Sequence, residues 1–220
     1  MNNCKFVLWG ASGQAKVIAD IVNSYGGIIT RVFDNNHIVS PLKNVEIGYG
    51  IEDFYTWLKS IDSPNEYSAI AAIGGAKGFD RFEFYKIFCT QGLNVPSIYH
   101  KTSYVSESAT IGKNVQILAF AFIGVDVIIG DTTIINTKAN VDHESKLGRG
   151  VHIAPNATLC GCVEIGDFSF IGANSVVLPR IKVGSNTIIG AGSVVTKNIP
   201  DNVIAYGNPA KIIRGQENVR

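Results

Sequence analysis

The chain has 220 residues, of which 46% are hydrophobic and 17% are charged, and its formal net charge at pH 7 is +1. This length suits one or two globular domains, and the near-neutral charge lacks the basic field that nucleic-acid binding requires. No apolar run reaches membrane-spanning length, so no membrane insertion is expected. The four cysteines form no CxxC pair and no disulfide framework, which is typical of a reducing compartment, and we expect a cytoplasmic protein.

The first part of the chain alternates strands and helices. Buried strands are predicted over residues 5–9, 28–33 and 67–73, with a further short strand over 94–97. Helical spacing of apolar residues predicts helices over residues 14–24, 51–61 and 79–90. This alternation is typical of a small parallel sheet covered by helices. We assign residues 1–96 to this Rossmann-like α/β domain.

Two glycine-containing loops follow predicted strands. Gly10-Ala-Ser-Gly13 follows the first strand, and Gly74-Gly75-Ala76-Lys77 follows the third. Ligands of parallel α/β sheets bind at the carboxyl ends of the strands, and helix N-termini favour anions. The first loop therefore predicts either a phosphate cradle or a plain strand-to-helix turn. It lacks the GxGxxG spacing of dinucleotide sites, which disfavours an NAD-dependent enzyme. Asp34 closes the second strand, where an acidic residue often meets a ribose.

Residues 105–200 carry a strict six-residue repeat. A branched aliphatic residue occupies every sixth position, glycine often follows it, and the position four after it is small or β-branched. The aliphatic positions are Val105, Ile111, Ile117, Ile123, Ile129, Ile135, Val141, Leu147, Ile153, Leu159, Ile165, Ile171, Val177, Val183, Ile189 and Val195. An α-helix cannot place every sixth residue on one face, because six residues turn it by about 600°.

A solenoid of short β segments and corners accounts for this repeat. The aliphatic side chains are expected to point inward, and the glycines to ease the backbone at the corners. We assign residues 97–220 to this all-β domain. The repeat ends at Pro200, and a turn-rich exit with mobile last residues is expected to follow.

The six-residue repeat resembles that of the hexapeptide-repeat acyltransferases, which implies a left-handed parallel β-helix with three repeats per coil. The pairing of this repeat with a Rossmann-like domain narrows the resemblance. The chain also contains motifs that carry this resemblance, namely Gly10-Ala-Ser-Gly13, Val141-Asp-His143-Glu144, Gly161 and Gly207-Asn-Pro209-Ala-Lys211. Together they are similar, over essentially the whole chain, to nucleotide-sugar N-acetyltransferases of the bacillosamine-pathway type. GDP-perosamine N-acetyltransferases and the sialic acid O-acetyltransferase group are related families.

The resemblance implies acetyl transfer from acetyl-CoA to the amino group of a nucleotide-linked 4-amino-4,6-dideoxy sugar, for glycan biosynthesis. UDP is the first choice of nucleotide, with GDP and dTDP as alternatives. Sugar O-acetylation of the sialic acid type is the alternative reaction. The resemblance also implies a homotrimer, with acetyl-CoA between neighbouring β-helices and the nucleotide on the N-terminal domain.

The resemblance further implies a role for each motif residue. His143 is the general base, a task that suits histidine because its ordinary pKa is about 6.5. Glu144 supports the imidazolium, with Asp142 as the alternative partner, and the backbone N–H of Gly161 steadies the thioester oxyanion. The substrate contacts implied are Gly10, Ser12, Gly13, Gln14, Asp34, Asn35, Gly74 and Arg81. The cofactor contacts implied are Asn136, His152, Gly161, Ala173 and Ala191.

Two other function classes stay open at this point. A metal-dependent hydratase on a β-helix, as in the γ-type carbonic anhydrases, needs three histidines on one ion. The repeat supplies only His143 and His152, so no metal is expected. A non-catalytic module that binds sugar nucleotides is the other alternative, and turnover with acetyl-CoA would exclude it.

Overall fold

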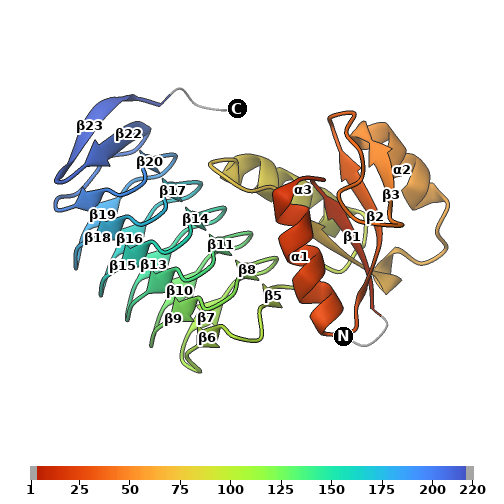
Figure 1. Cartoon of the computed structure of the whole chain (residues 1–220), viewed down its shortest axis with the longest axis horizontal. Coiled ribbons are helices and arrows are strands. Elements are labelled where there is room, and N and C mark those ends of the chain that lie inside the picture. Colours follow the sequence, from red (N-terminus) through yellow and green to blue (C-terminus); the bar gives the residue numbers. More distant parts are fainter. Residues whose placement is uncertain (1–3, 217–220) are drawn as a thin grey trace. The chain divides into compact units, whose positions relative to one another are not determined.

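The structure, a computed structural model, describes residues 4–216 and divides into two compact units (Figure 1). The first unit comprises the residues up to Ile73 together with Asp80–Ile98, and the second comprises Gly74–Phe79 and the chain from Tyr99 onward. The expected boundary at residue 96 differs from this division in two places, because the first unit continues to Ile98 and the loop of residues 74–79 groups with the second unit. None of the described helices is long and apolar enough to cross a membrane.

The first unit is built on a parallel four-stranded sheet in the order β3-β2-β1-β4. The strands are β1 (Lys5–Trp9), β2 (Ile28–Asp34), β3 (Glu46–Tyr49) and β4 (Tyr67–Ala71). The helices that follow them are α1 (Gly13–Ser24), α2 (Gly50–Lys59) and α3 (Gly78–Thr90), with a 3-10 turn at Pro64–Glu66. The sheet and its helices confirm the predicted α/β class.

Two details of this unit differ from the sequence prediction. The edge strand β3 was missed, because its four residues are half polar and include a glycine. Gly48 leaves room for the ring of Phe33, which a Cβ there would approach to 2.7 Å. The strand predicted over residues 94–97 is wrong: Asn94 forms only an isolated bridge to Ser68, and the next strand is β5 (Ile98–Tyr99).

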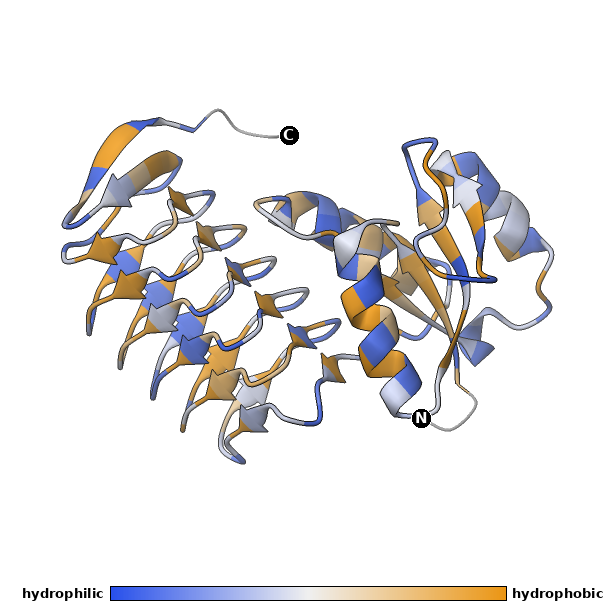
Figure 2. Cartoon of the chain, in the orientation of Figure 1, coloured by the Kyte–Doolittle hydropathy of each residue, from blue (hydrophilic) through white to orange (hydrophobic). Residues whose placement is uncertain are grey.

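Aromatic side chains fill the core of the first unit. Trp9 stacks on Phe84 with ring centroids 4.0 Å apart and on Phe33 at 6.0 Å. Large aromatic surfaces of this kind dominate the energetics of small cores. Helix α1 adds an apolar stripe at helical spacing, and Figure 2 shows the alternating hydrophobic and hydrophilic bands along it. The buried residues of α1 are Ala15, Ile18, Ala19, Ile21 and Val22.

The second unit is a parallel β-helix whose strands of two residues stack into three sheets. One coil takes 18 residues, since Ile128 pairs with Lys146. The first sheet contains β7 (Thr110–Ile111), β10 (Ile128–Ile129), β13 (Lys146–Leu147), β16 (Glu164–Ile165) and β19 (Lys182–Val183). The second contains β5, β8 (Gln116–Ile117), β11 (Ile134–Ile135), β14 (His152–Ile153), β17 (Phe170–Ile171) and β20 (Ile188–Ile189). The third contains β6 (Tyr104–Val105), β9 (Phe122–Ile123), β12 (Asn140–Val141), β15 (Thr158–Leu159), β18 (Val176–Val177) and β21 (Val194–Val195).

The aliphatic row of the repeat forms the core of the β-helix, as predicted. The row is buried from Ile117 to Val195, and the first two members, Val105 and Ile111, are partly buried and pack against it. Figure 2 shows hydrophobic colour recurring on the stacked strands. Because each coil repeats the last, the corners also stack, and residues 18 positions apart lie one above the other.

The role assigned to the repeat glycines is wrong. Where a glycine follows the aliphatic residue of the repeat, it does not take the left-handed conformation. It is required because the next coil stacks so closely that a Cβ at Gly130 would lie 2.6 Å from the carbonyl carbon of Gly148. The left-handed residue lies three positions after the aliphatic, with φ of 55–57° at Asn114, Asp126 and Glu144.

The exit from the β-helix is more ordered than the sequence suggests. β22 (Val203–Gly207) and β23 (Ala210–Gly215) form an antiparallel hairpin that extends the second sheet beyond β20. The expected turn is confined to Asn208 and Pro209, which a cis peptide bond joins. The residues expected to be mobile, 217–220, lie outside the described part of the chain.

Candidate functional site

His143 and Glu144 lie in the turn that joins β12 to β13. The left-handed conformation of Glu144, with φ of 57°, turns its side chain back toward its neighbour. Glu144 Oε2 therefore lies 3.1 Å from His143 Nδ1. Asp142 instead accepts a hydrogen bond from the backbone N–H of His143 at 2.8 Å. Glu144 is thus the carboxylate on the imidazole, and Asp142 fixes the backbone beneath it.

Gly161 lies on the next coil, directly against the His143 ring. A Cβ at Gly161 would collide with Nε2 and lie 2.5 Å from Cε1, so only glycine leaves room for the imidazole. The two coils are locked together beside this contact, because Cys162 N–H donates to the His143 carbonyl at 2.8 Å. The turn therefore places one imidazole nitrogen against a carboxylate and the other against the Gly161 backbone.

The N–H of Gly161 donates none of the hydrogen bonds that join the described coils. At the same turn position, Lys113, Arg149 and Ser185 donate to aspartate oxygens of the next coil at 2.7–2.8 Å. Within residues 4–216 no acceptor receives the Gly161 N–H. A backbone donor without an internal acceptor beside an imidazole is available to a bound ligand.

The electrostatics of this corner favour a charged Glu144. The hydrogen bond from His143 lowers the pKa of the Glu144 carboxyl, and the Cys162 thiol, whose Sγ lies 3.6 Å from Oε2, lowers it further. The side chains of His143 and Glu144 are 47% and 62% exposed, so a ligand can reach both. The arrangement can accept a proton at Nε2 and stabilise the resulting imidazolium at Nδ1.

Asn136 and His152 form a second group on a different part of the coil. His152 lies in β14 and is buried, and Asn136 follows β11. Asn136 Nδ2 lies 3.0 Å from His152 Nε2, and His152 Nδ1 lies 3.1 Å from the Gly75 carbonyl. Because the Gly75 carbonyl can only accept a hydrogen bond, the proton of the neutral His152 ring lies on Nδ1. His152 Nε2 therefore accepts a hydrogen bond from the Asn136 side-chain amide. His152 therefore holds the loop of residues 74–77 against the β-helix.

The predicted cofactor positions Ala173 and Ala191 stack on successive coils. Both follow strands of the second sheet by two residues, and the Gly192 N–H donates to the Ala173 carbonyl at 2.8 Å. They belong to the corner between the second and third sheets, as Asn136 does, whereas His143 belongs to the corner between the third and first sheets. One chain thus presents the predicted residues on two different corners.

The first glycine loop joins β1 to α1 at the carboxyl end of the sheet. Gly10 has φ of 105°, and a Cβ there would collide with the Ala72 carbonyl, so this glycine is required by the fold itself. Ser12 is the N-cap of α1 but makes no capping hydrogen bond with its side chain. Gly13 begins the helix with no atom within 4 Å of its Cβ position. The N-terminus of α1 is therefore open to an anion.

Asp34 fastens the first glycine loop from the end of β2. Its Oδ2 accepts from the Ala11 N–H at 2.8 Å, and its Oδ1 accepts from the backbone and side-chain nitrogens of Asn36, both at 2.9 Å. Asn35 between them is exposed. The carboxylate thus shapes the loop at the position where the sequence predicts a ribose contact.

Three predicted substrate residues have different surroundings. Gln14 lies in the first turn of α1, and Gly74 is half-buried in the loop before α3. Arg81 is fully buried and donates from Nη1 to the Ile73 carbonyl at 2.9 Å. Burial lowers the pKa of Arg81 to about 9, which still leaves the guanidinium charged at pH 7. Arg81 therefore braces the end of β4 and presents no surface to a ligand here.

A groove that the sequence analysis missed runs along the first sheet of the β-helix. Its volume is about 700 Å³. Lys146, Glu164 and Lys182 line it from β13, β16 and β19, and the last two form an ion pair at 2.9 Å. The signal in the sequence is a charged residue directly before the aliphatic in three repeats one coil apart. The groove begins where the His143 turn enters β13.

Two families match the chain. The family described as the PglD N-terminal domain matches residues 5–78. The family described as bacterial transferase hexapeptide (six repeats) matches residues 162–197. Among curated proteins, the acyl-[acyl-carrier-protein]–UDP-N-acetylglucosamine O-acyltransferase of Burkholderia orbicola is 36% identical over 83 residues, which cover 38% of this chain. The match spans 32% of the length of that relative.

Solved structures extend the similarity to nearly the whole chain. A mutant of perosamine N-acetyltransferase from Caulobacter crescentus, in complex with CoA and GDP-perosamine, is 30% identical with a TM-score of 0.86. The match covers 96% of this chain and 97% of that one. The acetyltransferase domain of PglB from Neisseria gonorrhoeae, in complex with acetyl coenzyme A, is 29% identical with a TM-score of 0.84, covering 96% and 100%.

Proposed function

The chain belongs to the hexapeptide-repeat nucleotide-sugar N-acetyltransferases, and on that premise we propose that it transfers the acetyl group of acetyl-CoA to the amino group of a nucleotide-linked 4-amino-4,6-dideoxy sugar. The observation that carries the proposal is the position of the His143 ring, between the Glu144 carboxylate and the Gly161 backbone. An N-acyl transfer needs a base, a group that stabilises the charged base, and a donor for the oxyanion. This corner supplies all three.

The proposed reaction is a direct attack of the amine on the thioester. The sugar nitrogen forms a bond to the thioester carbonyl carbon while His143 Nε2 takes the proton that the nitrogen loses. The carbonyl oxygen becomes an oxyanion and accepts the Gly161 N–H. The carbon–sulfur bond then breaks, and the thiolate of CoA leaves and takes up a proton, which the imidazolium can donate. A positioned general base contributes ~10²–10⁴ in rate, and an oxyanion donor about 2.7–4 kcal/mol.

Glu144 holds the imidazole in the tautomer that this step requires. Its carboxylate accepts the Nδ1 proton, so the neutral ring carries its lone pair at Nε2, on the side of Gly161. When Nε2 takes up a proton, the same carboxylate lies beside the imidazolium charge. The lowered pKa of Glu144 keeps the carboxylate ionised for both purposes.

The nucleotide belongs, on this proposal, to the glycine loop before α1. Gly13 and Ser12 present an uncapped helix N-terminus, which attracts phosphate through its backbone N–H groups and its dipole. UDP is the first choice of nucleotide that the family resemblance implies. GDP deserves equal weight in any test, because the similar perosamine N-acetyltransferase was solved with GDP-perosamine.

The assembly we propose is a homotrimer that acts in the cytoplasm, where its four free cysteines stay reduced. The two groups of predicted residues support a trimer, because they occupy different corners of one β-helix. Neighbouring β-helices side by side would set the His143 corner of one copy against the Asn136 corner of the next, and acetyl-CoA would lie between them.

A thiol-release assay tests the proposed function. Acetyl-CoA is supplied with UDP-, GDP- and dTDP-linked 4-amino sugars, and with the matching sugars that carry a hydroxyl in place of the amine. We expect CoA release with one amino sugar nucleotide and none with its hydroxyl analogue. Release with the hydroxyl sugars alone would identify an O-acetyltransferase. The absence of turnover with every acceptor would contradict the proposal.

A further inference from the structure

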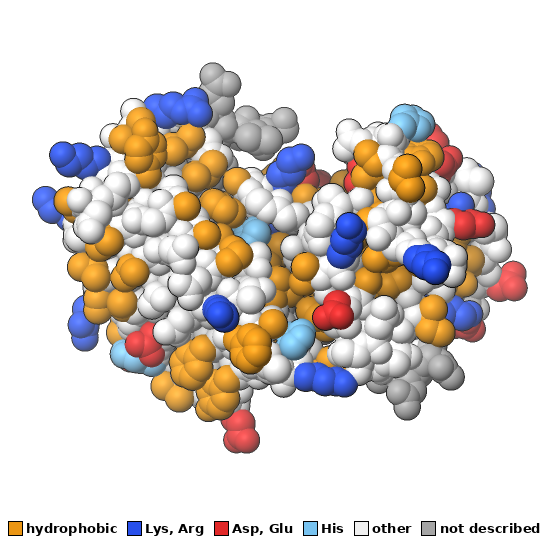
Figure 3. All heavy atoms as spheres, in the orientation of Figure 1, with side chains coloured by type: hydrophobic (Ala, Val, Ile, Leu, Met, Phe, Trp, Pro, Cys, Tyr) orange, Lys and Arg blue, Asp and Glu red, His pale blue; other side chains and the backbone are white. Residues whose placement is uncertain are grey.

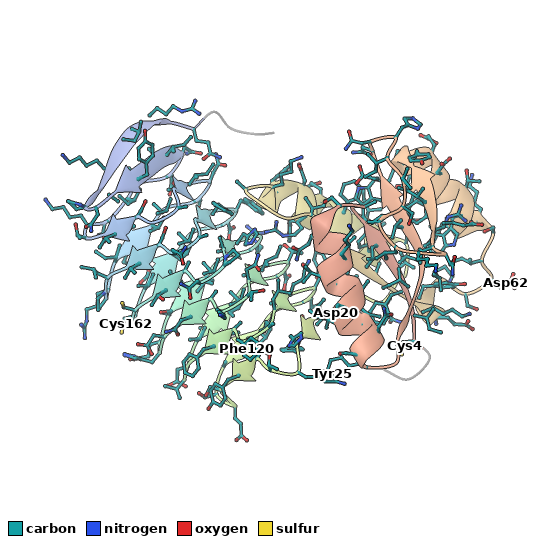
Figure 4. The ribbon with its side chains drawn as sticks, in the orientation of Figure 1. Cys4, Asp20, Tyr25, Asp62, Phe120 and Cys162 are labelled. Carbon is teal, nitrogen blue, oxygen red and sulfur yellow. The ribbon has the colours of Figure 1, made fainter. Side chains whose placement is uncertain are left out.

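A cysteine completes a cluster of three metal-binding groups at the His143 corner. His143 Nδ1, Glu144 Oε2 and Cys162 Sγ all lie within 4.8 Å of one another. Glu144 and Cys162 are 18 residues apart and occupy the same left-handed turn position on successive coils, with φ of 57° and 59°. Figure 4 shows Cys162 on a turn at the edge of the β-helix. The proposed reaction transfers no atom to or from this thiol.

The separations within the cluster suit a tetrahedral zinc ion. Zinc bonds to histidine nitrogen and carboxylate oxygen are about 2.0–2.2 Å long, and its bonds to sulfur are about 2.3 Å. A tetrahedron with those bonds separates nitrogen from oxygen by about 3.3 Å and sulfur from oxygen by about 3.6 Å. The structure has 3.1 Å between Nδ1 and Oε2 and 3.6 Å between Sγ and Oε2. Two of the three separations thus match the geometry of the ion, and the third, between Nδ1 and Sγ, is within 4.8 Å.

We propose that His143, Glu144 and Cys162 bind Zn²⁺, with water in the fourth position, and that the bound ion reversibly inhibits acetyl transfer. Imidazole nitrogen, carboxylate oxygen and thiolate sulfur together form a donor set that zinc prefers over the hard cations Mg²⁺ and Ca²⁺. The ion is an inhibitor and takes no part in the reaction. The binding site stands on the cluster alone, and only its inhibitory effect rests on the proposed function.

Inhibition follows from the tautomer that the ion would impose. The metal would occupy the Nδ1 lone pair, so the remaining proton of the neutral ring must sit on Nε2. Nε2 then has no lone pair to accept the proton of the sugar amine. Metal binding also releases the thiol proton of Cys162. The Glu144 carboxylate then bonds to the ion and no longer accepts a hydrogen bond from the imidazole. The base is therefore removed without any change in the fold.

The neighbouring cysteine provides a matched control. Cys160 lies two residues earlier in the chain, on the opposite side of Gly161, and does not belong to the cluster. Cys160→Ser and Cys162→Ser therefore make the same chemical change at two adjacent thiols, only one of which faces Glu144.

Metal binding is tested first without substrates, on the full chain. Co²⁺ serves as a spectroscopic substitute for Zn²⁺, because a cobalt–thiolate bond gives a charge-transfer absorption band. We expect the band in the wild type and in Cys160→Ser, and its loss in Cys162→Ser, with Zn²⁺ displacing Co²⁺. Calorimetric titration should give an affinity for Zn²⁺ that is at least ~10-fold weaker in Cys162→Ser than in the wild type. Equal Zn²⁺ affinity in the two serine variants would overturn the site.

Inhibition is tested second, with each variant compared with its own metal-free rate. Zn²⁺ should inhibit the wild type and Cys160→Ser at the same concentration and require at least ~10-fold more with Cys162→Ser. Mg²⁺ at equal concentration should have no effect, and a chelator should restore activity. Zn²⁺ that binds as described while turnover continues would overturn the inhibitory role. If the protein shows no turnover with any acceptor, the proposed function is contradicted. The cobalt absorption band would still show whether His143, Glu144 and Cys162 bind a metal ion.

Discussion

At the scale of single residues, the left-handed turn explains how two neighbouring side chains can act together. Adjacent residues of an extended strand point to opposite faces, so His143 and Glu144 could not meet within a strand. The positive φ of Glu144 reverses the chain at that point and brings its carboxylate to 3.1 Å from Nδ1. The residue type did not reveal this, because glutamate is uncommon in that conformation.

Gly161→Ala tests the contact between the glycine and the imidazole. The added methyl group would occupy the space of the His143 ring, so the ring must move away from the Gly161 N–H. We expect kcat to fall by ~10² or more, since both the base and the oxyanion donor lose their positions. Steady-state kinetics and the melting temperature of the variant would be measured together.

The control for this variant is Gly184→Ala. A methyl group there would crowd the Asp201 side chain and backbone of the next coil, and it meets no residue of the His143 corner. We expect it to lower the melting temperature while kcat stays near the wild-type value. Equal losses of kcat in the two variants would show that the Gly161 effect is a general consequence of strain in the coil.

The dependence of rate on pH tests the division of roles between His143 and Glu144. In the folded protein, the hydrogen bond with His143 lowers the pKa of the Glu144 carboxyl. The carboxylate therefore stays ionised when the pH falls to the ordinary pKa of glutamate. The loss of rate in acid should therefore follow the uptake of one proton and not two, because the Glu144 carboxylate stays ionised over that range. Glu144→Gln should lower the plateau of kcat and keep the one-proton limb. A two-proton limb in the wild type would contradict this assignment.

At the scale of elements, buried hydroxyl groups join one coil to the next. Ser169 Oγ donates to the Gly184 carbonyl at 2.6 Å and accepts from the Thr187 N–H at 2.9 Å. Ser175 makes the equivalent pair of bonds to Gly190 and Ser193. Where the small residue four places after the aliphatic carries a hydroxyl, it therefore joins two coils by hydrogen bonds as well as filling space.

Ser169→Ala should destabilise the β-helix without altering its shape. Alanine already occupies the equivalent position at Ala139 and Ala157, so the methyl group fits. The change leaves the buried N–H of Thr187 without its acceptor, which costs about 1–3 kcal/mol. Urea unfolding of the variant and the wild type would measure the difference. A stability unchanged within about 0.5 kcal/mol would show that the hydroxyl contributes only packing.

Much of the fold could be predicted from the sequence because the six-residue period has one physical explanation. The aliphatic row and the strands β1, β2 and β4 of the first unit needed no further information. What the sequence could not reveal depends on contacts between coils or between distant segments. The stacking that excludes a Cβ at Gly130, the burial of Arg81 and the hairpin formed by β22 and β23 are of this kind. At the site, the family resemblance implied the role of His143 as base, and only the turn geometry identified Glu144, and not Asp142, as the carboxylate on its ring.

The open N-terminus of α1 supports a prediction about nucleotide binding. Gly13→Val should fold normally, because no atom lies within 4 Å of its Cβ position. The valine side chain would stand where a phosphate meets the first backbone N–H groups, so affinity for the nucleotide sugar should fall. Affinity for acetyl-CoA should be unchanged. Calorimetric titration with each ligand checks this, and a loss confined to acetyl-CoA would place the nucleotide elsewhere.

At the scale of the whole molecule, exposed apolar residues gather on the first coils of the β-helix. Tyr104 and Phe122 stack at 5.1 Å on this surface, and Phe120 and Val125 are more than half exposed. Figure 3 shows hydrophobic side chains gathered over these coils, low in the view. Exposed patches of this kind mark surfaces that other chains cover. Sedimentation velocity should accordingly give the mass of a trimer, and a stable monomer at micromolar concentration would contradict the proposed assembly.

The most direct test of the account is the rate of acetyl transfer by His143→Ala. The side chain lies in an exposed turn and adds nothing to the aliphatic core, so the variant should fold and bind both substrates as the wild type does. With the accepted sugar nucleotide, kcat should fall by ~10²–10⁴, the usual contribution of a positioned general base. A variant that binds both substrates and works within a few-fold of the wild-type rate would contradict the central claim that His143 is the base.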